Sequence, residues 1–392
     1  MSDATPAFAP LPRADAADGS PRRVGVEIEL GGLSEARVAK IAQQAFGGTL
    51  ARGSGPSWKL EDSPVGALDI YLDTSLRKSE KSALRDAAMA LGRDIIPVEI
   101  VTEPLDLDGL ARLNRLLPHL RDGGARGSSA GLVLGFGVHF NVQIASDSMA
   151  DIRRPLTAYA LLEDWLRAAM PIDDTRRILP FTAPYPTTFV RALLALPENA
   201  PLAELVDLYV QHNPTRNRGL DMLPLFKHLA PDHLASVQTE ATSARPTFHF
   251  RLPDCRIDEP DWSLLTEWQR WLLVERLAED PRLLAAMGRV WQAAHGPVTL
   301  SRRTWAQRCG DLLIGAGCVR RVVAAGVAAA VIAATAVITA ALIAVTVLSP
   351  CFLRLSLALP APVTDPGLIP GSPATPETYS WLSIPCRATP YG

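Results

Sequence analysis

Cysteine is rare in this chain and never closely paired. The sequence has 5 cysteines in 392 residues and no C-x-x-C pair, and Cys255 alone lies before residue 300. This usage argues against a disulfide scaffold and against a zinc site, and it favours a reducing compartment.

The familiar signatures of nucleotide and hydrolase sites are also missing. No G-x-x-x-x-G-K-[ST], H-E-x-x-H or G-x-S-x-G occurs, and "GFGVHF" lacks the third glycine of G-x-G-x-x-G. With 39 basic and 41 acidic residues the charge is nearly balanced, and no basic stripe suggests a nucleic-acid partner. The first 21 residues form a Pro/Ala-rich leader that is expected to be disordered and has no basic–apolar signal. Scarce lysine beside abundant alanine, arginine and proline is typical of a GC-rich bacterial genome.

What the chain does contain is a short alternating stretch, "VGVEIELG" at residues 24–31. With the two-residue period of a strand, the aliphatic side chains share one face and Glu27 and Glu29 share the other. Carboxylates at i and i+2 lie about 7 Å apart. Like charges that close repel, so the pair favours a cation between them, unless the face is simply solvated.

Four later segments alternate in the same way: residues 67–75, 95–105, 132–144 and 245–254. Their polar faces carry metal ligands and anion binders rather than the lysine, serine and threonine of a solvated sheet. The members of this predicted working face are Glu27, Glu29, Asp73, Glu99, His139, Asn141, His249 and Arg251.

The fold predicted from these patterns is α+β, a sheet covered by helices on one side. Helices are expected at 34–46, 81–94, 107–124, 156–170 and 200–212, with a mostly helical insertion over 151–238. A Trp-rich helix after residue 260 is expected to pack in the core. The glycine-rich stretch 47–59 is predicted to be a turn or mobile loop.

Residues 322–348 form an uncharged run of 27 residues, long enough to cross a bilayer. Arginines dominate the 301–321 segment before it and are sparse in the Pro-rich tail 349–392. The positive-inside rule then places a catalytic domain of residues 22–300 in the cytoplasm, anchored to the inner membrane by a C-terminal transmembrane helix. The other interpretation is that the tail has no role.

Carboxylates with a single imidazole suit a hard cation such as Mg²⁺ or Mn²⁺, which in proteins usually also contacts substrate phosphates. Arg251, Arg216 and Arg218 are natural partners for phosphoryl oxygens. The segment from Asn213 to Asp221, which also holds Asn217, could shape an acceptor site, or its polar residues could serve helix capping and ion pairs.

Five segments taken in order, "GVEIEL", "VEIVTEPL", "GVHFNV", "NPTRNRGLDMLPL" and "RPTFHFRLP", resemble the predicted amidoligase family over about residues 22–300. That family is a branch of the carboxylate–amine ligases that share the glutamine synthetase and glutamate–cysteine ligase fold. The resemblance implies a curved antiparallel sheet in which metal ions hold ATP. It further implies an acyl-phosphate intermediate attacked by an amine, so the partners are a carboxylate and an amine substrate, among which a peptide or protein is an option.

Carried over residue by residue, the resemblance implies metal ligands and phosphoryl or nucleotide contacts on this chain. Glu27, Glu29, Glu99 and His139 are the expected metal ligands; Arg251, Arg216 and His249 the expected catalytic residues; and His139, Asn141, Asn217 and Arg218 the expected nucleotide contacts.

Two positions depart from the wider fold. His249 stands where better-known relatives carry glutamate, which leaves the number of metal ions open, and Asn141 stands where some relatives repeat histidine. Two alternatives to the ligase also stay open: a phosphotransferase or phosphatase of the same fold, and an inactive membrane-anchored module that binds nucleotide or peptide.

Overall fold

A computed structural model of the protein describes residues 7–72, 97–128, 135–170, 182–234, 242–295, 302–321 and 379–380. The chain divides into two compact units, Met1–Cys318 with Ser383–Gly392, and Val319–Leu382. In the second unit, the described residues form one short antiparallel pair between β9 (Arg320–Arg321) and β10 (Tyr379–Ser380).

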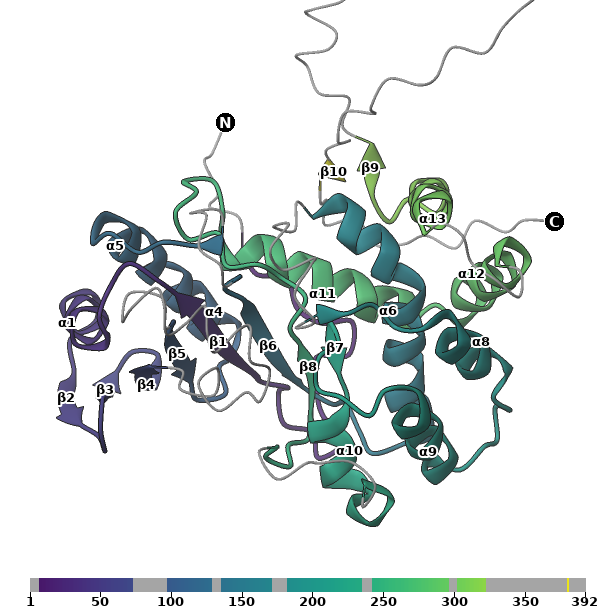
Figure 1. The fold of residues 1–392 in the computed structure, drawn as a ribbon, viewed down its shortest axis with the longest axis horizontal. Helices are drawn as coiled ribbons and strands as arrows, with labels where there is room; N and C mark the ends of the chain where they lie inside the picture. The colour runs from purple at the N-terminus through teal and green to yellow at the C-terminus, as the bar shows by residue number, and fades with distance from the viewer. Residues whose placement is uncertain are drawn as a thin grey trace, which may run out of the picture. The chain divides into compact units, whose positions relative to one another are not determined.

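The first unit is built on an open, fully antiparallel sheet of eight strands (Figure 1). The strand order is β2-β3-β4-β5-β1-β6-β8-β7, so β1 lies in the interior between β5 and β6. In chain order the strands are β1 (Val24–Leu30), β2 (Thr49–Arg52), β3 (Ser57–Ser63), β4 (Gly66–Leu72), β5 (Val98–Thr102), β6 (Val138–Gln143), β7 (Leu220–Asp221) and β8 (Thr247–Phe250). The predicted mixed helix and antiparallel sheet is therefore confirmed, and the sheet does not close.

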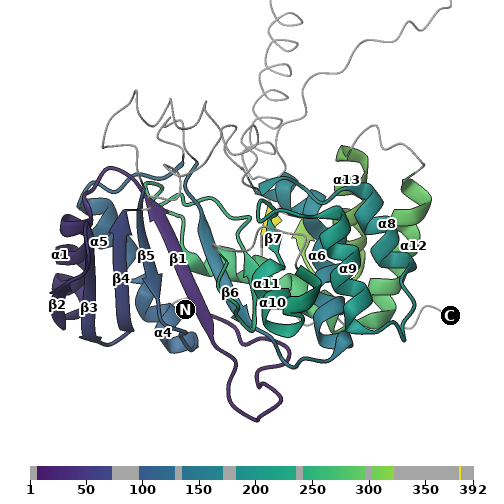
Figure 2. The same ribbon diagram turned by 60° about the horizontal axis from the view of Figure 1, so that its bottom comes forward.

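Helices occupy the intervals between the strands. They are α1 (Glu35–Phe46), α4 (Leu107–Asn114), α5 (Leu116–Asp122), α6 (Met149–Ala169), α8 (Thr187–Ala195), α9 (Leu202–His212), α10 (Leu223–Leu229), the 3₁₀ helix η4 (Pro231–Leu234), α11 (Leu264–Ala278), α12 (Pro281–Ala294) and α13 (Arg303–Gly315). Helices α6, α8, α9, α12 and α13 lie together beyond the β8–β7 side of the sheet (Figure 2).

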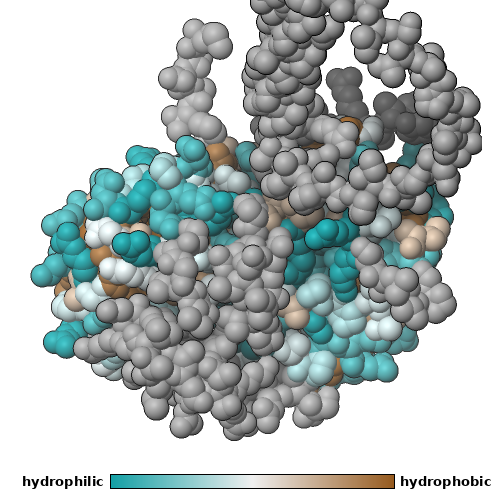
Figure 3. Space-filling view, turned by 45° about the horizontal axis from the view of Figure 1, so that its top comes forward, coloured by the Kyte–Doolittle hydropathy of each residue, from teal (hydrophilic) through white to brown (hydrophobic). Residues whose placement is uncertain are grey.

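The core lies between the apolar face of the sheet and helix α11. Val26, Ile28 and Leu30 of β1 are fully buried. On neighbouring strands Phe140 meets Trp268 at 6.0 Å between ring centroids, and Phe250 meets Trp271 at 5.5 Å. The Trp-rich helix is thus part of the core, as predicted. Among the described residues on the face shown in Figure 3, hydrophilic side chains dominate and apolar ones are scattered.

A buried ion pair joins Arg22, just before β1, to helix α11. Arg22 donates from two guanidinium nitrogens to the Glu275 carboxylate, at 2.9 and 2.6 Å, and Trp271 Nε1 donates to that carboxylate at 3.1 Å. Burying an ion pair is favourable only when the geometry is good and further hydrogen bonds satisfy the remaining atoms, and both conditions hold here.

The glycine-rich stretch 47–59 corrects one prediction. It is not a loop but contains β2 and the start of β3, joined through residues 53–56. β2, at the edge of the sheet, and β3 beside it bury little on either face, so they lack the alternation of apolar and polar residues that reveals a strand. Gly48 has φ +84°, and a Cβ there would strike the carbonyl oxygen of Glu61.

The predicted helix 107–124 is interrupted. It forms α4 and α5, separated at Arg115. Pro118 explains the break, because its ring would clash with the Asn114 carbonyl of a continuous helix and it has no N–H to donate. The predicted helix 81–94, the predicted polar-face residue Asp73 and the predicted membrane span 322–348 lie outside the described residues.

Two findings bear on compartment and membrane. Cys318 is disulfide-bonded, while Cys255 and Cys309 are free, which departs from the reduced thiols that the cysteine spacing predicts. Within the part of the chain that the structure describes, no helix is both long and apolar enough to span a bilayer.

Gly219 offers a test of this packing, because a Cβ there would collide with the Tyr159 hydroxyl. Tyr159 is fully buried and its hydroxyl donates to Glu163 at 3.2 Å, so the ring has little room to retreat. Gly219→Ala is expected to lower the free energy of unfolding by about 1–3 kcal/mol, as overpacking does.

Chemical denaturation measures the effect, with Gly315→Ala as the control. Gly315 ends α13 with nothing near its Cβ position, so alanine there should be neutral or slightly stabilising. Equal stability of the two variants would contradict the packing described around Gly219.

Candidate metal centre

Strand register brings five polar side chains together on one face of the sheet. Glu27 of β1 pairs with His139 of β6, Asn141 of β6 pairs with His249 of β8, and His249 pairs with Asp221 of β7. All five project from the face opposite α11, because side chains alternate along each strand. Segments more than 200 residues apart in sequence thereby meet at one place.

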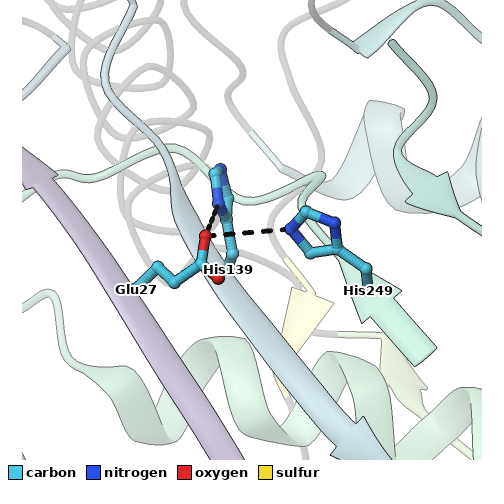
Figure 4. Close-up of side chains that lie close together, drawn as sticks. All are labelled: Glu27, His139 and His249. Atoms are coloured by element: carbon cyan, nitrogen blue, oxygen red, sulfur yellow. Dashed lines mark hydrogen bonds and ion pairs between the residues drawn. The ribbon is translucent and has the colours of Figure 1, made fainter. Parts of the chain in front are cut away.

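The Glu27 carboxylate is the centre of this row, and Figure 4 shows the two imidazoles directed towards it. One oxygen, Oε2, lies 2.9 Å from His139 Nδ1 and 3.9 Å from His249 Nε2. The other, Oε1, accepts from Asn141 Nδ2 at 2.8 Å and from Arg245 Nη1 at 3.1 Å. The Glu27 side chain is only 12% exposed, so these donors replace solvent.

The two histidines stand edge to face, with ring centroids 5.2 Å apart. On the far side of His249, its Nδ1 lies 3.5 Å from Asp221 Oδ2. Asp221 is fully buried; it accepts from Arg216 Nε at 3.1 Å and from the Leu223 amide at 3.0 Å.

Electrostatics set the protonation states of the cluster. Burial is the largest influence on Glu27 and raises its pKa, but the His139 hydrogen bond, the charges of both histidines and the Asn141 amide together hold the pKa of Glu27 well below its usual range. Burial lowers the pKa of His139 to about 3. Glu27 is therefore a carboxylate and His139 a neutral imidazole at neutral pH, the states in which each can bind a cation.

Glu27, His139 and His249 fit a metal ion. Each offers one ligand atom, and these atoms lie within 4.8 Å of one another. His249 Nε2, which faces Glu27, is buried without a hydrogen-bond partner, at a cost that a bound cation would relieve. Among the described residues, this is the one group of three or more such side chains close enough to share an ion.

The remaining predicted metal ligands lie beside the cluster. Glu29 Oε2 accepts from the Gly137 amide at 2.6 Å, and Glu29 Oε1 is 3.7 Å from His139 Nε2. Glu99 pairs with Glu29 across β1 and β5 and is half-buried. The two carboxylates thus continue the polar face towards β5, next to the histidine cluster.

The predicted phosphate contacts lie in the segment before β7 and, for Arg251, directly after β8. Arg251 Nη1 donates to the Arg216 carbonyl at 2.9 Å. The positive charge of Arg251 also contributes to lowering the pKa of His139 and of Asp221. Arg218 Nη1 donates to the Pro184 carbonyl at 2.8 Å, while the Asn217 amide donates to Thr215 Oγ1 at 3.2 Å.

Sequence reasoning missed two members of the site, Arg245 and the role of Asp221. Arg245 could have been found, because it precedes His249 by four residues and Arg251 by six, so the alternation that assigns those two to the polar face includes it. Asp221 sits on a strand of two residues, too short to leave a periodic signal.

The described residues thus form a mixed helix and antiparallel-sheet fold with a buried glutamate–histidine centre. A family model described as "Putative amidoligase enzyme" matches residues 20–273, which include every residue of the cluster. The chain belongs to this amidoligase family, a family of amide-bond-forming ligases. A search of the curated proteins found no match.

The centre is tested by Glu27→Gln, which keeps the shape of the side chain but removes its negative charge. Mn²⁺ affinity measured by isothermal titration calorimetry is expected to fall by more than about a hundredfold, since loss of mere outer-shell partners already costs about 10–100-fold.

Glu61→Gln is the matched control, because Glu61 is on β3 of the same sheet with its side chain 49% exposed. Unchanged Mn²⁺ binding in Glu27→Gln would remove Glu27 from the centre.

Proposed function

We propose that this chain is an ATP-dependent carboxylate–amine ligase that forms an amide bond through an acyl phosphate. The observation that supports it most directly is the buried Glu27–His139–His249 cluster, formed on the polar face of the sheet in a chain of the amidoligase family. The open antiparallel sheet is also what a glutamine synthetase-like catalytic fold requires.

In this proposal, Glu27, His139 and His249 hold a divalent ion, and the neighbouring carboxylates Glu29 and Glu99 face the Mg²⁺ that accompanies ATP. A divalent ion in such a site neutralises charge that develops on phosphoryl oxygens. Mg²⁺ in proteins is commonly held by one or two carboxylates together with substrate phosphates, which suits the Glu29–Glu99 pair.

The reaction has two balanced steps. A substrate carboxylate oxygen attacks the γ-phosphorus of ATP, the bond to the β,γ-bridging oxygen breaks, and ADP leaves. The amine nitrogen then attacks the acyl carbon, inorganic phosphate leaves, and the amine gives up a proton. The chain's part is to position the reactants and to stabilise phosphoryl charge, which is most of what phosphoryl-transfer enzymes do.

Arg251 and Arg216 are the residues proposed to contact the transferring phosphoryl group. The guanidinium of Arg251 is fixed on the Arg216 carbonyl, and Arg216 is fixed on Asp221, so both are preorganised. Fixed cations aimed at developing charge are typically worth about 10²–10³-fold in rate. Asn141, Asn217 and Arg218 complete the proposed nucleotide contacts.

Product analysis tests the mechanism. With ATP, Mg²⁺ and a panel of carboxylic acids, hydroxylamine as the amine should trap any acyl phosphate as a hydroxamate, in an amount equal to the ADP formed. AMP and pyrophosphate would mean an adenylate instead, and ADP with a phosphorylated acceptor but no hydroxamate would mean a phosphotransferase.

Substitution of Arg251 tests the assigned phosphoryl contact. Arg251→Ala is expected to lower kcat by about 10²–10³-fold, because it removes charge stabilisation in the transition state. Arg289→Ala on α12, where Arg289 is exposed, should leave kcat unchanged. A normal kcat in Arg251→Ala would refute the assignment.

The proposed location rests on sequence alone. The uncharged run 322–348 would anchor the protein in the inner membrane with the site in the cytoplasm. A chain ending at Cys318 should appear in the soluble fraction while the full chain pellets with membranes. Pelleting of both, or of neither, would refute the anchor.

A further inference from the structure

Each histidine of the centre lies between Glu27 and a second carboxylate. His139 has Nδ1 at 2.9 Å from Glu27 Oε2 and Nε2 at 3.7 Å from Glu29 Oε1. His249 has Nε2 at 3.9 Å from Glu27 Oε2 and Nδ1 at 3.5 Å from Asp221 Oδ2. Glu29 and Asp221 therefore occupy equivalent places at the far nitrogens of the two rings.

This arrangement fixes what each ring presents to the centre. A carboxylate beside one imidazole nitrogen holds the ring proton there, which leaves the lone pair on the other nitrogen free to bind a cation. Asp221, beside Nδ1 of His249, thereby leaves Nε2 of that ring for the centre. A bound cation would replace the hydrogen bond from His139 Nδ1 to Glu27, and the His139 ring proton would then lie on Nε2, beside Glu29. The second carboxylate of each pair acts as a support for the ring.

Asp221 is placed as a rigid support. Besides the hydrogen bonds of Asp221 to Arg216 and the Leu223 amide, the residues on either side of it are held by two buried phenols. Tyr185 donates to the Leu220 carbonyl at 2.5 Å, and the Tyr209 hydroxyl accepts from the Met222 amide at 3.1 Å. The carboxylate is locked on the outer side of His249.

The composition of the centre then decides the class of ion. A site of several carboxylates with a single imidazole suits a hard cation such as Mg²⁺. The register of β6 and β8 instead gives this centre two imidazoles and one carboxylate. Imidazole suits transition metals, whereas Mg²⁺ prefers oxygen ligands and keeps several waters.

We propose that the Glu27–His139–His249 centre holds a resident divalent transition-metal ion in preference to Mg²⁺, with Asp221 as the positioning residue of His249. This assignment rests on the proposed function in one respect: the Mg²⁺ that accompanies ATP is treated as a second ion, separate from the one in the centre. That second ion is assigned to the Glu29–Glu99 side of the polar face.

The test uses the full chain stripped of metal, with Co²⁺ as a spectroscopic probe and no ATP. One Co²⁺ per chain should bind with a visible absorption band, and Zn²⁺ should displace it while a large excess of Mg²⁺ does not. Displacement by Mg²⁺ as readily as by Zn²⁺, or no bound Co²⁺, would overturn the proposal.

Asp221→Asn then tests the positioning role. Its Co²⁺ affinity should fall by about 10–100-fold with a changed absorption band, as loss of an outer-shell partner does. Glu61→Gln should bind as the parent does, and unaltered affinity and spectrum in Asp221→Asn would refute the role. If circular dichroism shows that Asp221→Asn does not fold, Glu29→Gln decides the support by the second carboxylates in the same assay.

The two proposals fail separately. Absence of ADP and hydroxamate with ATP would count against the ligase reaction alone, because metal binding needs no nucleotide. A Mg²⁺-selective centre in an active ligase would count against the transition-metal assignment alone.

Discussion

The alternation of β1 is the constraint on which the rest of the structure depends. Val24, Val26, Ile28 and Leu30 are buried beneath the sheet, and a shift of one residue would bring Glu27 into that core. The cost of burying a carboxylate without partners is several kcal/mol, so the register is strongly specified. Because β1 lies between β5 and β6, fixing it also fixes Glu99 and His139.

The burial of Glu27 explains why so many elements converge on it. Its three hydrogen-bond donors are His139 and Asn141 of β6 and Arg245, which precedes β8, and His249 of β8 lies 3.9 Å away. No single strand could supply these contacts. His249 Nε2, which faces Glu27, remains buried without a hydrogen-bond partner. In the proposed function a cation held by Glu27, His139 and His249 would bind this nitrogen, which connects the packing of the sheet to the proposed chemistry.

Much of the fold and of the candidate site could be predicted from the sequence. The same physical reasons explain which parts could not be predicted. In strands with one buried face, apolar and polar residues alternate along the sequence. This alternation predicts β1, β4, β5, β6 and β8 with their polar residues, but not the more exposed β2 and β3. Strand order is a matter of long-range pairing, and alternation does not reveal it. Sequence spacing therefore groups Glu29 with Glu27 and places His139 and His249 on one polar face, but only the register of β1, β6 and β8 shows that both imidazoles lie beside Glu27.

The most direct measurement of the account is a crystal structure of the protein soaked with Mn²⁺, with the ion located by its anomalous scattering. We expect a peak bounded by Glu27, His139 and His249, with Asp221 on the outer side of the His249 ring. A peak confined to Glu29 and Glu99, with both histidines unligated, would contradict it.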